Sequence, residues 1–147
     1  MSRFQKAILG FLIVMLVVLC AWAYWEREIP MSDLLPDADW TDVRILMGDT
    51  DSPEREQELA SPPMEEILAA VSEARVTRDT KNSHLDDSYF QIYLCSEEGY
   101  PTVVYVNRNG RLQIAADMDF DHYQYYEGGE SLYKALESIC ASLSPLE

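Results

Sequence analysis

The segments YFQIYLC (89–95), TVVYVN (102–107) and RLQIAA (111–116) decide the fold, because they are three successive strand candidates. Aromatic and β-branched residues dominate them, as is typical of strands. The intervening EEGYP (97–101) and NRNG (107–110) are short turn sequences, and an Asn-Gly turn joins strands in antiparallel fashion. The region therefore predicts an antiparallel β-meander.

Two amphipathic helices are predicted on either side of this meander. Ser61 is the expected N-cap of the first helix, which should run to about Arg75, and Ser131 is the expected N-cap of the second. Their apolar residues recur at helical spacing: Met64, Ile67, Leu68 and Val71 in the first, and Leu132, Leu136, Ile139, Cys140 and Leu143 in the second.

Further strands are expected before and after the first helix. Val43, Ile45 and Met47 alternate in residues 41–47, and a short strand is expected at residues 76–80, whereas residues 49–60 indicate a solvated loop. Few helices alternate with strands, so parallel crossovers are excluded. The prediction is an α+β two-layer sandwich, with a meander of about four to five strands packed against two helices.

The N-terminus contains an apolar segment of membrane-spanning length. Nineteen residues from Ala7 to Trp25 carry no charge, close to the roughly 20 that a transmembrane helix needs. Arg3 and Lys6 precede it, so the positive-inside rule predicts a cytoplasmic N-terminus and an extracytoplasmic C-terminal domain. Cleavage of the segment as a signal peptide near Ala23 is the alternative.

Three regions follow from this boundary. Residues 1–25 are the anchor or signal peptide, residues 26–40 are a juxtamembrane stalk interrupted by Pro30 and Pro36, and residues 41–147 are the extracytoplasmic domain. Residues 26–147 hold nine basic and 26 acidic residues, a net charge of −17. Such a charge repels nucleic acid and favours divalent cations, cationic peptides or a basic protein surface. A surface that keeps the domain soluble near a negatively charged envelope is the alternative.

The acidic loop DMDFDHYQYYEGG (117–129) contains the candidate metal and binding residues. Asp117, Asp119 and Asp121 alternate and would supply oxygen ligands for calcium, although His122 stands where an EF-hand needs glycine. A solvated acidic loop is the alternative. His84 and His122, with Asp86, Asp87 and Asp121 nearby, have no zinc-site spacing, and hydrated histidines are the expected reading.

Tyrosine is abundant in the domain and concentrated on the meander and before the last helix. Because tyrosine buries a large area at low entropic cost, Tyr123, Tyr125 and Tyr126 are the predicted binding surface. Cys95 and Cys140 would close a loop of about 45 residues if they oxidised to a disulfide. Two buried thiols are the alternative.

Several short motifs resemble a family of uncharacterised small extracytoplasmic domains from Gram-positive bacteria, usually tethered by one N-terminal apolar segment. The resemblance implies a similar fold, and it supplies no activity, ligand or catalytic residue. The motifs are Leu34-Leu35-Pro36, Thr77-Arg78-Asp79-Thr80 with Ser83, the segment from Tyr89 to Leu94, Tyr105-Val106 with Gly110, Tyr126-Glu127-Gly128, and Leu132-Tyr133.

Three functions are compatible with the sequence. The leading hypothesis is a non-enzymatic, membrane-anchored binding or sensing domain for a protein or cationic ligand, without a cofactor unless calcium binds. The second is an envelope hydrolase or metal-dependent enzyme that uses the Asp/His loop at residues 117–127. The third is a passive accessory subunit of a larger membrane protein, bound through residues 7–25.

Overall fold

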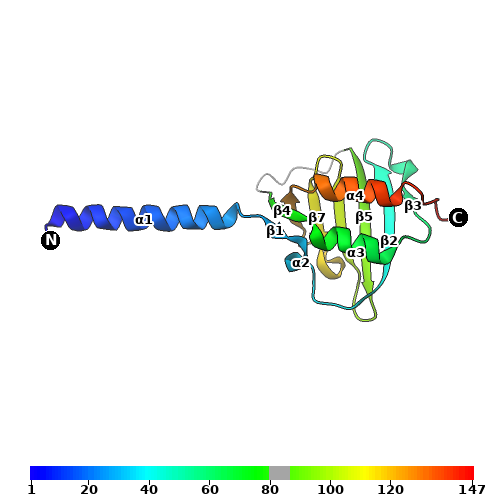
Figure 1. Cartoon of the computed structure of the whole chain (residues 1–147), viewed down its shortest axis with the longest axis horizontal. Helices are drawn as coiled ribbons and strands as arrows, with labels where there is room; N and C mark the ends of the chain where they lie inside the picture. Colours follow the sequence, from blue (N-terminus) through cyan, green and yellow to red (C-terminus); the bar gives the residue numbers. More distant parts are fainter. Residues whose placement is uncertain (80–86) are drawn as a thin grey trace.

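The computed structural model describes residues 1–79 and 87–147, which form a long N-terminal helix followed by one α+β domain (Figure 1). In these ranges one antiparallel sheet has eight strands in the order β1-β4-β8-β7-β6-β5-β2-β3. The strands are β1 (Ile29–Pro30), β2 (Trp40–Asp49), β3 (Gln57–Glu58), β4 (Arg75–Arg78), β5 (Ser88–Ser96), β6 (Thr102–Asn107), β7 (Leu112–Ala115) and β8 (Gln124–Glu127).

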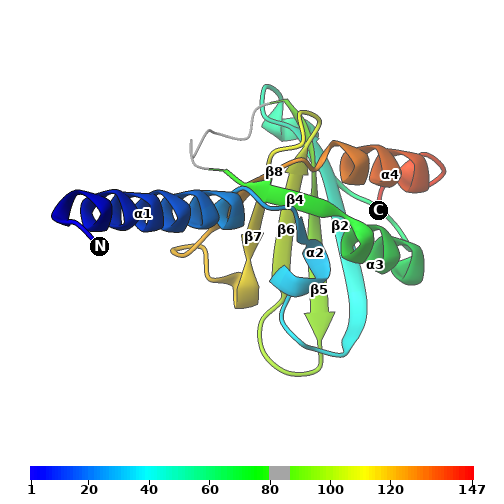
Figure 2. The same ribbon diagram turned by 60° about the vertical axis from the view of Figure 1, so that its left-hand side comes forward.

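The helices are α1 (Arg3–Trp25), α2 (Met31–Leu34), α3 (Met64–Glu73) and α4 (Glu130–Cys140), with short 3-10 turns η1 (Pro53–Arg55) and η2 (Ala116–Met118). The long helices of the domain, α3 and α4, lie side by side on one face of the sheet (Figures 1 and 2). The predicted α+β class, antiparallel sheet and pair of covering helices are therefore confirmed.

The sheet has more strands than the predicted four to five. β5, β6, β7 and β8 form a continuous meander, and β2 pairs with β5 along most of its length. β1 and β3 have two residues each, too few for an alternating pattern to appear in the sequence. β8 lies within the acidic segment that was predicted to be a loop, and it pairs with both β7 and β4.

The core lies between the sheet and the two helices. Phe90, Ile92 and Leu94 of β5 point toward α3 and α4, together with Val104 and Val106 of β6. The residues that alternate with them point to the opposite face, as the pleat of a strand requires. This alternation separates a core face from a second face, which no helix of residues 1–79 and 87–147 covers.

Both helices begin differently from the prediction. α3 begins at Met64 with Pro63 as N-cap, and Ser61 has a positive φ of 50°. α4 begins at Glu130 with Gly129 as N-cap, so Ser131 lies inside the helix. The start of α4 is packed against the β6–β7 turn: the Gly129 N–H donates to the Gly110 carbonyl at 2.8 Å. A Cβ at Gly129 would lie 3.0 Å from that carbonyl oxygen, so this close contact positions the helix start.

The predicted stalk is part of the domain. Ile29 of β1 and Met31 of α2 are buried in the core, and the Met31 N–H donates to the Ala74 carbonyl at 2.8 Å. The Ile29-Pro30-Met31 sequence is too short to give a periodic signal. Residues 26–40 therefore join α1 to the domain through packed contacts.

α1 has 23 residues, none of them buried, and is long and apolar enough to cross a membrane. Ser2 caps its N-terminus: its hydroxyl accepts from the Gln5 N–H, and the Gln5 side chain accepts from the Ser2 N–H. At the other end the Arg78 guanidinium of β4 lies 5.1 Å from the Trp25 ring and donates to the Trp25 carbonyl at 3.4 Å. These contacts connect the helix to the sheet.

Candidate functional site

The candidate site is the sheet face that α3 and α4 leave without a helix. Five tyrosines lie there on β5, β6, β8 and the residue before β8, together with one glutamine on β5 and one on β7. We call this surface the tyrosine face, and its residues are Tyr89, Gln91, Tyr93, Tyr105, Gln113, Tyr123 and Tyr125.

The strand register builds this surface as a row across four strands. Gln91 of β5 pairs with Tyr105 of β6, and Tyr105 pairs with Gln113 of β7. Gln113 in turn pairs with Tyr125 of β8. Amide and phenol side chains thus alternate across the sheet, so the row combines flat apolar rings with hydrogen-bonding groups.

Four of the five tyrosines are in contact with another aromatic ring. Tyr89 and Tyr105 are stacked, with ring centroids 4.5 Å apart and planes inclined by 23°. Tyr123 lies 6.3 Å from Tyr125 and 5.5 Å from Phe120 by the same measure. These separations fall within the range of favourable aromatic pairs, so the face carries two preorganised groups of rings, Tyr89 with Tyr105 and Tyr123 with Phe120 and Tyr125.

Gly48 makes room for one of these rings. It is paired with Tyr89 on the neighbouring strand, and a Cβ at Gly48 would lie 2.6 Å from the Tyr89 hydroxyl. The ring of Tyr89 therefore lies over bare backbone, and its hydroxyl donates a hydrogen bond to Glu56. A side chain at position 48 would displace the ring and separate it from Tyr105.

Arg44 of β2 is held on the edge of the tyrosine face. Its Nε and one terminal nitrogen donate to the two carboxylate oxygens of Glu58 at 2.7 and 2.9 Å. The guanidinium carbon also lies 5.7 Å from the centroid of the Tyr93 ring. The Arg44 guanidinium thus contacts both a carboxylate and a phenol ring, a combination that stabilises positive charge.

Burial and neighbouring charge shift the ionisation of this surface. Burial raises the pKa of the Tyr89 phenol to about 12, and its hydrogen bond to Glu56 acts in the same direction. Burial also raises the pKa of Tyr105, and the adjacent Tyr89 adds to the effect. The hydrogen bond from Arg44 lowers the pKa of Glu58. At neutral pH the phenols are therefore uncharged while the carboxylate is ionised.

Alkaline titration is expected to show this shift. The neutral phenol of Tyr89 is favoured in the folded state, so its contribution to stability is complete below pH 10 and is lost as pH rises toward 12. Subtracting the ultraviolet spectrum of Tyr89→Phe from that of the wild type isolates the phenolate absorbance of Tyr89. This absorbance should appear near pH 12. Ionisation near pH 10, the ordinary tyrosine value, would contradict this environment.

The predicted binding residues divide between the two faces of the sheet. Tyr123 and Tyr125 belong to the tyrosine face, whereas Tyr126 is part of the core and its hydroxyl donates to Gln124 at 2.7 Å. Because β8 was predicted as a loop, the alternation of Tyr125 and Tyr126 could not be assigned. The sequence signal that could have located the β5 part of the tyrosine face is the Tyr-x-Gln-x-Tyr pattern at 89–93. Its polar residues alternate with the apolar Phe90, Ile92 and Leu94.

The predicted calcium ligands do not come together. Among the described residues no group of three or more His, Cys, Asp or Glu side chains is placed to hold a metal ion. Asp117 has a positive φ of 52° and lies in η2, so Asp117, Asp119 and Asp121 do not form an alternating strand. An oxygen of the Asp119 carboxylate instead lies 2.9 Å from His122 Nδ1.

The predicted histidine site is also not assembled in the part of the chain that is described. His122 is 81% exposed in its side chain, and its Asp119 partner is 53% exposed. The carboxylate of Asp87 lies 3.8 Å from Arg108 on the β6–β7 side of the molecule. His84 and Asp86 lie outside the described residues.

The two cysteines of the α+β domain, Cys95 and Cys140, are both free thiols. Cys95 shares the side of the sheet that carries the tyrosine face, because it alternates with the buried Leu94. Cys140 belongs to α4 on the other side, where burial raises the pKa of its thiol to about 11. The sheet lies between them, so this structure has no disulfide at these positions, and the buried-thiol alternative describes Cys140.

No family model matches this sequence, and no curated protein or solved structure matches it either. The resemblance to small tethered domains of Gram-positive bacteria therefore stays a prediction, and the geometry of the chain itself carries the functional argument.

Proposed function

We propose that this chain is a non-enzymatic, membrane-anchored extracytoplasmic binding domain whose tyrosine face binds a basic segment of a partner protein. The observation that carries the proposal is Arg44, whose guanidinium is bound by the Glu58 carboxylate and the Tyr93 ring. Arginine or lysine side chains of a partner would find the same chemistry along the rest of the face.

The charge of the domain supports a cationic partner. Residues 26–147 carry a net charge of −17, and Glu56, Glu58 and Glu127 border the tyrosine face. A field of this sign accelerates encounter with a basic surface and repels nucleic acid and anionic lipid. The short-range contacts of the tyrosines would then supply affinity, since tyrosine is enriched in protein interfaces.

The proposed orientation places this surface outside the cell. Arg3 and Lys6 before α1 favour a cytoplasmic N-terminus, and the length of α1 is compatible with a retained anchor. The proposal includes a Gram-positive source, which rests on the motif resemblance alone. The Asp/His loop supports a hydrolase less well, because its one His–Asp pair, His122 with Asp119, lies in solvent.

Binding of a synthetic peptide tests the proposal. The full chain, solubilised in a non-ionic detergent, is titrated into a fluorescent peptide with alternating arginines, and anisotropy is measured. A peptide with glutamine in place of each arginine is the first control. We expect saturable binding of the arginine peptide, weakened by salt because charge pairing contributes, and about tenfold weaker binding of the glutamine peptide.

Paired tyrosine variants distinguish the face from general electrostatics. Tyr125→Ser removes a ring from the face and should weaken arginine-peptide binding about tenfold. Tyr100→Ser is the matched control, because Tyr100 is 72% exposed and lies outside the tyrosine face. Equal affinities for the two variants would refute the site. If the chain bound an uncharged glycan more tightly than the arginine peptide, the proposed basic ligand would be wrong.

A further inference from the structure

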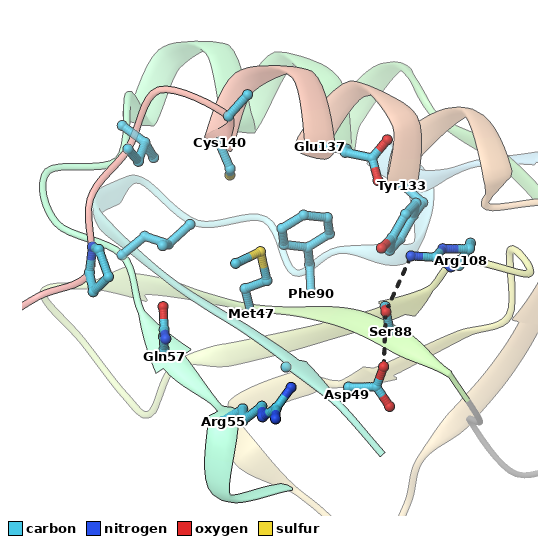
Figure 3. Close-up of a pocket in the computed structure, with 15 residues that line it drawn as sticks. Met47, Asp49, Arg55, Gln57, Ser88, Phe90, Arg108, Tyr133, Glu137 and Cys140 are labelled. Atoms are coloured by element: carbon cyan, nitrogen blue, oxygen red, sulfur yellow. Dashed lines mark hydrogen bonds between the residues drawn. The ribbon is translucent and has the colours of Figure 1, made fainter. Parts of the chain in front are cut away.

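A second candidate site lies on the opposite side of the sheet, at the end of the domain farthest from α1 (Figures 1 and 3). It is a cavity of about 490 Å³ between α4, the β2–β5 pair, the η1–β3 segment and the C-terminal tail. This volume is in the range of small-molecule pockets. Tyr133 and Cys140 of α4 face Met47 and Phe90 across it (Figure 3).

The cavity has an apolar wall and a polar end. Its apolar lining is Met47, Leu59, Phe90, Cys140, Leu143 and Pro145. Its charged lining consists of two arginines, Arg55 and Arg108, and two carboxylates, Asp49 and Glu137. In a domain with a net charge of −17, a lining with equal numbers of each sign is much less repulsive to an anion than the surrounding surface.

Three of these charges already have neighbours within the protein. Arg108 lies 3.8 Å from the Asp87 carboxylate and donates to the Ser88 hydroxyl at 3.4 Å. Asp49 accepts from the Ser88 hydroxyl at 3.2 Å and from the Asp51 N–H at 2.9 Å. The hydrogen bond with Tyr133 is the main cause that raises the pKa of Arg108, and the negative charge of Glu137 raises this pKa further.

Arg55 differs from the other charged residues of the cavity. It forms no ion pair with any residue in ranges 1–79 and 87–147, and it is the last residue of η1 at the cavity wall. Figure 3 shows its side chain extended beside Gln57 and below Met47. A guanidinium in this position binds carboxylates well, because it presents several donors in a fixed plane.

We propose that this cavity binds a small amphipathic carboxylate, with the carboxylate on Arg55 and an alkyl or aryl body against Met47 and Phe90. The apolar wall excludes a purely polar anion as the preferred ligand, because burying those side chains against apolar groups supplies the affinity. The cavity is remote from α1, so the ligand enters from the aqueous phase. This site is independent of the tyrosine face.

The test uses three water-soluble probes with one hydrophobic body. 4-Phenylbutyrate, 4-phenylbutan-1-ol and 4-phenylbutylamine share a phenyl ring and a chain of nearly equal length, and their head groups are an anion, a neutral hydroxyl and a cation. Each is titrated against the full chain in a non-ionic detergent, and binding is measured by ligand-observed NMR against a detergent blank. We expect saturable binding of the carboxylate with a Kd below about 1 mM, and affinities about tenfold weaker for the alcohol and the amine.

Three variants locate the interaction. Arg55→Gln should weaken carboxylate binding about tenfold and leave alcohol binding unchanged, since only the charged hydrogen bonds are lost. Lys134→Gln removes the same charge from an exposed position of α4 outside the cavity and should have no effect. Ala141→Trp places a large ring in the lining from an exposed position and should abolish binding of all three probes.

Several results would overturn the proposal. These are absence of saturable carboxylate binding, equal affinity for the three probes, equal affinity of wild type and Arg55→Gln, and unchanged binding by Ala141→Trp. Tyr125→Ser should bind 4-phenylbutyrate normally, because Tyr125 lies on the other side of the sheet. A wrong proposal for the cavity can therefore be distinguished from a wrong proposal for the tyrosine face.

Discussion

Phe90→Ala is expected to lower the free energy of unfolding by about 3–5 kcal/mol, a large part of the roughly 5–15 kcal/mol of a typical domain. Phe90 is 2% exposed, and its ring lies 5.1 Å from that of Tyr133. It connects the first half of β5 with α4, so its loss removes contacts on both layers of the core. Urea unfolding of the full chain in detergent, followed by near-ultraviolet circular dichroism, measures the change.

Phe120→Ala is the matched control for this prediction. Phe120 is 41% exposed and contacts Tyr123 at 5.5 Å. Removing its ring should cost no more than about 1.5 kcal/mol, the upper range for one aromatic pair. If Phe90→Ala were no more destabilising than Phe120→Ala, the assignment of the core face of β5 would be wrong, and with it the assignment of the tyrosine face.

Gly48→Val is expected to destabilise the domain by about 1–3 kcal/mol, although valine is a better strand residue than glycine. The added Cβ would lie 2.6 Å from the Tyr89 hydroxyl oxygen and 2.7 Å from the ring carbon that bears it. The ring must therefore leave its stacked position on Tyr105 and its hydrogen bond to Glu56. The same denaturation measurement gives the energy, and loss of arginine-peptide affinity is expected alongside it.

A double-mutant cycle isolates the cause of this effect. In a Tyr89→Ala background the ring is absent, so Gly48→Val should cost much less than in the wild type. The difference between the two costs is the coupling between position 48 and the Tyr89 ring. Equal costs in both backgrounds would show that Gly48 is required for a reason other than this ring.

Local patterns in the sequence predicted the elements whose periodicity is long enough to read. β5, β6 and β7 alternate or are continuously apolar, the Asn109-Gly110 turn joins β6 to β7, and α3 and α4 have apolar faces at helical spacing. The turn glycine has a φ of 81°, a conformation that glycine adopts without strain. Each of these features depends on residues close together in the chain.

Long-range pairing decided the elements that local patterns missed. β1 and β3 are two residues long and exist only because β4 and β2 offer them free edges. β8 was predicted as a loop because its acidic surroundings hide four residues that complete the sheet between β7 and β4. The N-caps at Ser61 and Ser131 were wrong because packing positioned the starts of α3 and α4.

The candidate site likewise combines features that the sequence shows with features that only strand pairing decides. The abundance of tyrosine and the net charge of −17 are properties of the sequence, and they led to a predicted binding surface at Tyr123, Tyr125 and Tyr126. Only the register of β5 through β8 brings Gln91, Tyr105, Gln113 and Tyr125 into one row. The same register turns Tyr126 into the core and separates Cys95 from Cys140.

The sequence by itself determined an apolar N-terminal helix, an acidic α+β domain and the central meander, because hydrophobic spacing and charge act locally. The tertiary structure alone decided which tyrosines share a face and which charged residues border the cavity. Arg55 and Phe90 are 35 positions apart in the chain and line one cavity only because β3 pairs with β2, and β2 with β5. Such contacts depend on which strands pair and in which register, which short-range periodicity does not specify.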